Sequence, residues 1–200
     1  MLKVVFVTNY IVKNGPGNVI LNLINNLDDA RYEISLITLF EGNDVYVVKS
    51  LRNKGVKVHE CIALNRTMCI LGRADEFEKI IQRENFDVIH SHGFIGDILS
   101  SRLNLPIKKI TTIHNDMYED YLDTYGYVKS RVFIALHLAA LKKLNRCVCC
   151  SKSVYQTVGK KLGNAVYIRN GIQAAEAHSV VTRKELGIPE NKRYFCMRVF

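Results

Sequence analysis

Short apolar runs and amphipathic segments alternate along the chain from its first residues. The run 3–9 (KVVFVTN) is almost continuously apolar, which is typical of a parallel strand buried on both faces. After a loop that contains two glycines, apolar residues recur at helical spacing from Val19 to Leu27. The same succession predicts further strands at 32–40, 56–61, 86–91, 109–114, 147–150 and 165–168, and further helices around 45–51, 77–81, 95–103, 128–144 and from 151 to about 163.

Repeated strand–helix units predict an α/β fold with a parallel sheet and helices on both faces. Because the crossovers are right-handed, we expect a doubly wound, Rossmann-like sheet over residues 1–172. Ligands of such sheets bind beyond the carboxyl ends of the strands. The candidate site positions are therefore 9–18, 91–96, 114–119, 151 and 170–171.

The last part of the chain has a different pattern. Residues 173–181 are alanine-rich and weakly patterned, which indicates a linker, and 182–186 predict one short helix. The run 193–200 (RYFCMRVF) resembles a first strand whose partners do not follow. We therefore expect 173–200 to be a linker and the truncated start of a second domain.

The charge of the chain favours anionic partners. Its formal net charge is +9, with 28 basic and 19 acidic residues, which suits nucleotide diphosphates, acidic glycans or anionic lipids. The basic pairs at 142–143, 160–161 and 183–184 are short and are typical of solvated surface. Aromatic residues are not interleaved with a basic stripe, so the pattern does not indicate nucleic-acid binding.

The N-terminal residues, the length of the apolar stretches and the cysteines bear on the cellular location of the protein and on the redox state of its thiols. The first ten residues resemble a strand rather than a signal peptide, and no stretch of about 20 apolar residues predicts a membrane span. The six cysteines include a C-x-C-C run that is not a zinc pattern, so we expect reduced, mostly buried thiols and no metal. These features predict a cytoplasmic protein. A peripheral contact with the inner face of a membrane, through the basic helix 128–144, is left open beside an ordinary inter-strand role for that helix.

Two groups of residues are candidates for chemistry. Gly15 and Gly17 open a helix and could bring backbone N–H groups to a phosphate, although a plain tight turn explains them equally well. Ile20 stands where a dinucleotide fingerprint needs glycine, which argues against a dehydrogenase. We expect His90 and His92 to point in opposite directions, so that only one faces a given site. His114 closes an apolar strand and could hydrogen-bond a sugar hydroxyl or a phosphate oxygen.

Five pieces taken in order resemble the N-terminal domain of the family 4 glycosyltransferases, which have the GT-B architecture. They are VVFVTNYIVKNGPGNVILNLINNL, DVIHSHG, TIHND, CVCCSKSV and VYIRNGI. The resemblance implies two Rossmann-like domains with the active site in the cleft between them. The N-terminal domain then holds the acceptor and the C-terminal domain holds the nucleotide sugar. It also implies transfer with retention, no tightly bound metal and no cofactor.

The resemblance also implies roles for individual residues. His114 matches the cleft histidine that contacts the transferred sugar and would be the catalytic residue. The donor-phosphate loop would be Gly15, Gly17 and Asn18. The acceptor would contact residues that follow two of the strands, namely His92, Gly93, Asn115, Asp116 and Glu119. The glycine loop departs from the family pattern, because its second glycine is displaced and the usual acidic residue is missing.

The implied function is transfer of a sugar from a nucleotide sugar to a glycan or lipid-linked acceptor, in the synthesis of a surface polysaccharide or lipopolysaccharide. We expect these 200 residues to be inactive alone, because the donor-binding domain is not among them. Two alternatives stay open. One is a stand-alone acceptor-binding module that works with a separate donor subunit, and the other is a fragment of a GT-B-type nucleotide-sugar epimerase.

Overall fold

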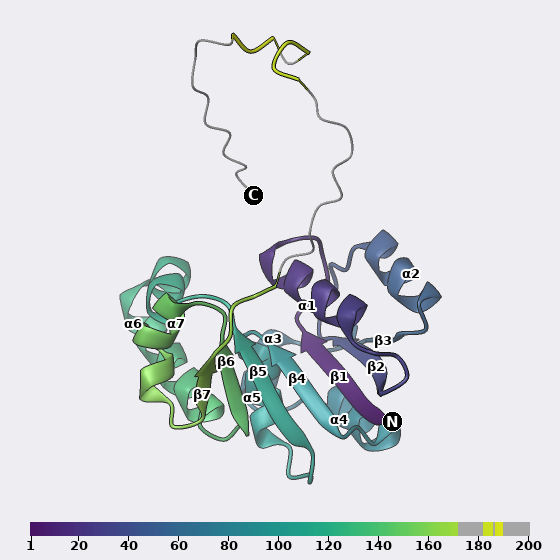
Figure 1. Ribbon diagram of the computed structural model, residues 1–200. Helices are drawn as coiled ribbons and strands as arrows, with labels where there is room; N and C mark the ends of the chain where they lie inside the picture. The colour runs from purple at the N-terminus through teal and green to yellow at the C-terminus, as the bar shows by residue number, and fades with distance from the viewer. Residues whose placement is uncertain (172–181, 186, 190–200) are drawn as a thin grey trace.

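The computed structural model describes residues 1–171, 182–185 and 187–189. Seven strands form one parallel sheet in the order β3-β2-β1-β4-β5-β6-β7 (Figure 1). They are β1 (Leu2–Thr8), β2 (Tyr32–Thr38), β3 (Lys57–Glu60), β4 (Val88–His92), β5 (Lys108–Ile113), β6 (Arg146–Cys149) and β7 (Ala165–Tyr167). The predicted α/β fold, a Rossmann-like doubly wound parallel sheet, is confirmed.

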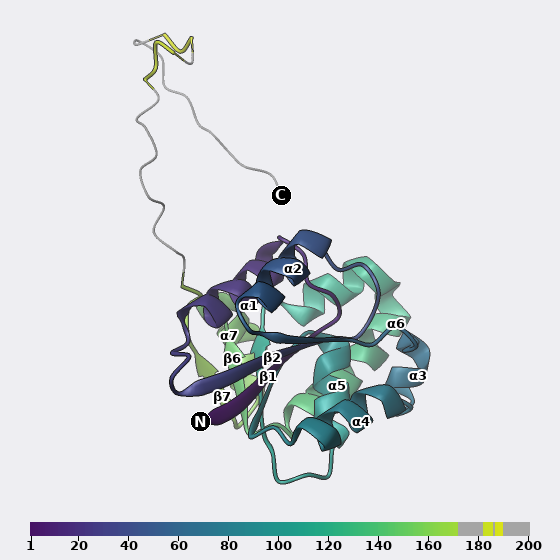
Figure 2. The same cartoon turned by 90° about the vertical axis from the view of Figure 1, so that its right-hand side faces the viewer.

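The helices connect successive strands. They are α1 (Gly15–Asn26), α2 (Val45–Asn53), α3 (Arg66–Ile70), α4 (Asp75–Glu84), α5 (Phe94–Arg102), α6 (Met117–Leu141) and α7 (Lys152–Thr157), with a 3₁₀ turn, η1, at Gly159–Lys161. Helices α1 and α2 pack on one face of the sheet, whereas α4, α5 and α6 pack on the other (Figure 2). The crossovers change face between β1 and β4, which are neighbours in the sheet. This arrangement leaves a crevice beyond the carboxyl ends of these two strands.

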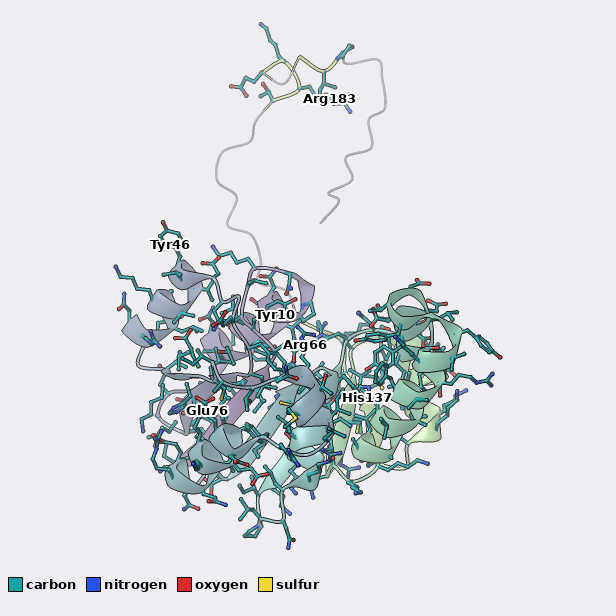
Figure 3. All side chains as sticks on the ribbon, turned by 180° about the vertical axis from the view of Figure 1, so that it is seen from behind. Tyr10, Tyr46, Arg66, Glu76, His137 and Arg183 are labelled. Carbon is teal, nitrogen blue, oxygen red and sulfur yellow. The ribbon has the colours of Figure 1, made fainter. Side chains whose placement is uncertain are left out.

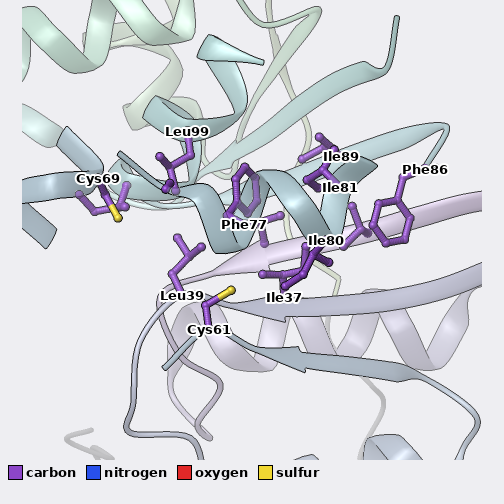
Figure 4. Packing of buried hydrophobic residues seen from close by; sticks show 14 residues of the cluster. Ile37, Leu39, Cys61, Cys69, Phe77, Ile80, Ile81, Phe86, Ile89 and Leu99 are labelled. Atoms are coloured by element: carbon purple, nitrogen blue, oxygen red, sulfur yellow. The ribbon is translucent and has the colours of Figure 1, made fainter. Parts of the chain in front are cut away.

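Apolar side chains from both layers explain why the central strands are continuously hydrophobic. On one face, Phe77 and Ile81 of α4 are fully buried against Ile37 and Ile89 of the sheet (Figure 4). Truncating a buried aromatic residue such as Phe77 costs about 3–5 kcal/mol of stability, so this packing fixes the strands that carry the site.

Two helices differ from the prediction. Helix α6 begins at Met117, not near 128, because Asp116 caps it by accepting a hydrogen bond from the Tyr118 N–H at 2.9 Å. Gly126, with φ of 72°, then interrupts the helix and separates two halves. Helix α3 was not predicted, since it has only five residues. Its first residue, Arg66, lies over the ring of Phe40 at 4.9 Å (Figure 3).

The end of the chain is described only in part. Residues 182–185 form a turn rather than the predicted helix, in which the Glu185 N–H donates a hydrogen bond to the Thr182 hydroxyl at 3.4 Å. The predicted linker at 173–181 and the predicted strand at 193–200 lie outside the described residues. The proposed division of the chain near residue 172 therefore stays a prediction.

Candidate functional site

A pocket of about 260 Å³ lies where β1, β4 and β5 end, between the first turn of α1 and the first half of α6. Its position is the one that the fold predicts for a ligand site. Five of the predicted site residues line it, namely Gly17, His92, Gly93, His114 and Asn115. The structure thus brings together segments that are up to about 100 positions apart in the sequence.

Three histidine rings form a stack that reaches this pocket: His92 and His114 line it, and His90 lies behind them. His90 and His92 lie on the same face of β4, with ring centroids 4.4 Å apart, so the expectation that they point in opposite directions was wrong. Side chains alternate along a strand, and residues two positions apart therefore share a face. His114, after β5, continues the stack at 5.2 Å from His92. A hydrogen bond joins Nδ1 of His92 to Nε2 of His114, with 2.9 Å between the two nitrogens.

Burial keeps these three imidazoles neutral. It lowers the pKa of His90 to about 4 and the pKa of His92 well below its usual value, and the neighbouring imidazoles act in the same direction on His92. Burial also lowers the pKa of His114, although the Asp97 carboxylate partly opposes it. At neutral pH, His114 therefore offers a hydrogen bond to a ligand rather than a positive charge.

Two buried polar atoms of the pocket residues have no hydrogen-bond partner within the described part of the chain. They are Oδ1 of Asn9, just after β1, and Nε2 of His92. A buried polar atom without a partner costs about 1–3 kcal/mol, and either an ordered water or a ligand hydroxyl can supply the missing partner. An amide oxygen and an imidazole nitrogen are both well suited to a hydroxyl group.

A buried polar network supports the α6 side of the pocket. Asp97 of α5, only 1% exposed, accepts hydrogen bonds from the Ser91 hydroxyl at 2.6 Å and from His137 Nε2 at 2.8 Å. The other nitrogen of His137 bonds the Tyr121 hydroxyl at 2.7 Å, and Tyr121 lines the pocket. Figure 3 shows His137 on α6 and Tyr10 at the rim above the sheet.

Sequence reasoning missed this network. The signals were a single acidic residue inside the apolar run FIGDILSS and a single histidine inside the apolar second half of α6. Each of these residues alone is consistent with many roles. Their pairing is not apparent from the sequence, because Asp97 and His137 are 40 positions apart.

The first turn of α1 already uses most of its own donors. Asn14 caps the helix, since its side-chain oxygen accepts the Gly17 N–H at 2.8 Å and its carbonyl accepts the Asn18 N–H at 2.8 Å. Pro16 has no N–H to offer. Gly17 is required for close approach, because a Cβ atom there would collide with the Val12 carbonyl oxygen. A Cβ atom added to Gly15 would meet no other atom within 4 Å. A phosphate at this loop would have to displace Asn14, so the predicted donor-phosphate role of Gly15, Gly17 and Asn18 stays a prediction.

The remaining predicted acceptor residues divide into two groups. Gly93, with φ of 91°, turns the chain from β4 into α5 inside the pocket, and Asn115 is exposed at its edge. Asp116 is engaged as the cap of α6, and Glu119 is exposed on the first turn of that helix; neither lines the pocket. The predicted acceptor-binding role of these four residues therefore stays a prediction.

The charge of the pocket is not that of a diphosphate site. Among the described residues that line it there is no lysine or arginine, whereas two carboxylates, Asp97 and Asp120, are present. Groups that stabilise a transferring or leaving phosphate are normally cations or clusters of N–H donors. The lining therefore fits uncharged, hydroxyl-rich ligands better than phosphates.

Elsewhere in the described residues, no group of three or more histidine, cysteine or acidic side chains is arranged to hold a metal ion. Burial raises the pKa of the Cys61 and Cys147 thiols to about 12, so neither is activated as a nucleophile. None of the helices in the described ranges is long and apolar enough to cross a membrane.

Comparison with known proteins identifies the family. The model of glycosyltransferase family 4 matches residues 13–176, which include every element from α1 to β7. The chain belongs to glycosyltransferase family 4. Two curated relatives, both O-antigen biosynthesis glycosyltransferases WclY from Escherichia coli, are 28% identical over 200 residues. These matches cover 95% of this chain and 51% of each relative, so the chain spans about half the length of the relatives it matches.

Solved structures show the same fold. Sucrose-phosphate synthase from Thermosynechococcus elongatus superposes with a TM-score of 0.65 at 11% identity, over 96% of this chain and 54% of that protein. HepE from Anabaena, solved with UDP and glucose, gives 0.61 at 14% identity, over 86% of this chain and 45% of that protein. The family 4 chain described here therefore has the Rossmann-like fold of the N-terminal half of GT-B glycosyltransferases.

Proposed function

We propose that this chain is the acceptor-side half of a retaining glycosyltransferase that moves a sugar from a nucleotide sugar to a glycan or lipid-linked acceptor. Membership of family 4 and the names of the two E. coli relatives support a role in the synthesis of O-antigen or a related surface polysaccharide. The observation that carries the proposal is the pocket itself, with its neutral histidines and its two unpartnered polar atoms.

His114 is the residue that we expect to touch the reacting sugar. Burial lowers the pKa of its imidazole, which is therefore neutral at pH 7, and His92 fixes the orientation of the ring through their hydrogen bond at 2.9 Å. A neutral, oriented imidazole can hold a sugar hydroxyl in one position, and positioning of this kind accounts for much of the rate in transfer reactions. Asn9 and His92 would contribute further hydroxyl contacts through their unpartnered atoms.

The donor phosphates require groups that the pocket does not contain among its described residues. A departing nucleoside diphosphate develops negative charge, which needs cations or free N–H donors. The pocket offers two carboxylates instead, and the first turn of α1 is capped by Asn14. We therefore propose that transfer by these 200 residues alone does not occur, and that the other half of a GT-B enzyme supplies the phosphate contacts. The protein would act in the cytoplasm, at the inner face of the membrane that carries its lipid-linked acceptor.

A thermal-shift series with a transfer assay tests this proposal. The purified chain is melted with a panel of nucleotide sugars, with UDP and GDP, and with oligosaccharides. A ligand at 100 times its Kd stabilises by about 2.7 kcal/mol, which such a scan detects. The proposal expects a shift with a saccharide, none with UDP or GDP, and no transfer. Tight binding and turnover of a nucleotide sugar would place the donor site within these residues and refute the division of labour.

A further inference from the structure

The positive charge of the chain is concentrated in one continuous segment. Residues 124–171 contain nine lysines and arginines and no acidic residue. The whole chain has 28 basic and 19 acidic residues, so the remainder contains 19 of each and is neutral. All nine cations are exposed; they are Lys129, Arg131, Lys142, Lys143, Arg146, Lys152, Lys160, Lys161 and Arg169. The net charge of +9 therefore belongs to the part of the molecule built from the second half of α6, β6, α7, η1 and β7.

The second half of α6 has apolar side chains on its solvent face. Its inner face packs through His137 and Leu141, while Val128, Val132 and Leu136 are 75%, 55% and 37% exposed. These three residues are four positions apart, so they form one stripe along the helix. Ala135 and Ala139 continue the stripe and are also exposed. A helix on the surface of a soluble domain normally presents polar residues there, so a contiguous apolar stripe indicates a binding surface.

Cations border this stripe on both sides. Lys129 lies along one edge of the stripe and Arg131 along the other, as the helical repeat of 100° per residue requires, and Lys142 and Lys143 follow the last residue of the helix, Leu141. Arg131 also lies over the ring of Tyr127, which is 66% exposed. An apolar face flanked by lysine, arginine and tyrosine is the composition of helices that lie in the interface of a membrane.

Acidic residues occur only on the other half of the helix. Glu119, Asp120 and Asp123 precede the break at Gly126, on the half that borders the pocket. The break thus separates an acidic half at the pocket from a half whose solvent-exposed face is basic and apolar. Tyr125, which lines the pocket and is 39% exposed, lies between the two halves.

We propose that the outward face of α6 beyond Gly126, together with Lys142 and Lys143 directly after the helix, docks the protein on an anionic lipid surface. The observations that favour lipid over a soluble polyanion are the exposed valines and leucine, which a purely electrostatic partner would not need. The inference extends the proposed function, since docking through α6 would place the neighbouring pocket beside a lipid-linked acceptor. Binding to vesicles, however, involves no sugar and is measured independently of transfer.

Vesicle co-sedimentation of the 200-residue chain tests the proposal. The vesicles are phosphatidylcholine alone, or phosphatidylcholine with about one-third phosphatidylglycerol, at low and at high salt. We expect binding to the anionic vesicles that weakens with salt, because the attraction is screened over about 10 Å at 0.1 M ionic strength. The double variant K142Q/K143Q should bind about 30-fold more weakly at low salt, since each basic residue near such a surface contributes a factor of about five.

A matched pair of substitutions tests the apolar part. Val128→Glu places a charge in the stripe, and Val45→Glu makes the same change at the start of α2, where the valine is also 75% exposed. Both are surface changes, and equal melting temperatures would show that both variants fold. Loss of vesicle binding in the first variant only supports the proposal. Equal binding of the two variants, or equal binding to neutral and anionic vesicles, would overturn it.

Two further results would assign the surface to another partner. If the chain forms a dimer that Val128→Glu disrupts, the stripe is an interface between copies. If the chain binds a soluble polyanion but not vesicles, and Val128→Glu leaves that binding intact, the charge serves a polymer. Either result refutes lipid docking while leaving the proposed transferase function untouched, because saccharide binding at the pocket is measured separately.

Discussion

The stack of neutral histidines makes the stability of the fold depend on pH in a defined window. His90 is buried on β4 beneath α1, and its Nε2 bonds the Thr112 hydroxyl at 2.9 Å. Burial lowers its pKa to about 4 in the folded protein, against a usual value of 6.5. The unfolded chain therefore binds more protons than the folded one between these two values, and acid favours unfolding.

The size of the effect follows from the same two values. Stability from His90 is fully present above pH 6.5 and declines as the pH falls toward 4. One unit of pKa difference corresponds to 1.36 kcal/mol, so at pH 5.0 the loss from His90 alone is about 2 kcal/mol. His92 and His114 have pKa values lowered by burial as well and add to the loss in the same direction.

Urea denaturation at pH 7.5 and at pH 5.0 measures this loss in the wild type and in two variants. In His90→Gln the difference between the two pH values should shrink by about 2 kcal/mol, because glutamine does not titrate. His59→Gln is the control, because that histidine is only half-buried on β3 and lies outside the stack, although burial lowers its pKa as well. An unchanged pH difference in His90→Gln would refute the argument that His90 is neutral because it is buried.

Three further changes have defined outcomes. Gly17→Ala should lower the free energy of unfolding by about 1–3 kcal/mol, because its methyl group collides with a carbonyl, whereas Gly15→Ala should be near neutral; thermal melts of the pair would contradict this if both shifted equally. Asp97→Asn should lower the free energy of unfolding by about 2 kcal/mol in urea denaturation, since the charged acceptor of the His137 N–H would be lost. An unchanged urea midpoint would contradict the hydrogen bond between Asp97 and His137. Cys61 and Cys147, with pKa values near 12 from burial, should resist alkylation at pH 8 until the protein is unfolded; rapid labelling of the native chain, followed by mass spectrometry, would contradict their burial.

The strands and the topology could be predicted because parallel strands leave an unmistakable pattern. Val4 to Val7 are buried on both faces, so the run is continuously apolar and its boundaries fall within a residue or two of β1. The position of the site followed from the fold rule for strand ends, which selected the segments that carry His92 and His114.

The rest depended on contacts that are distant in the sequence. The pairing of Asp97 with His137 joins α5 to α6 across 40 positions, and a single sequence contains no information on that pairing. The start of α6 was missed although the sequence contains it, since Met117, Tyr121 and Tyr125 recur at helical spacing and Asp116 and Glu119 have the spacing of a helix cap. The orientation of His90 and His92 was an error of strand geometry and could have been avoided from the sequence.

Saturation-transfer NMR of the 200-residue chain with a nucleotide sugar and with free oligosaccharides tests the central claim most directly. The claim is that the pocket at His114 recognises sugar hydroxyls and that the phosphate contacts come from elsewhere. It predicts saturation of sugar-ring protons, its loss in His114→Ala with the fold intact, and no saturation of the base or ribose protons. Strong saturation of the nucleotide, or sugar signals that persist in His114→Ala, would contradict it.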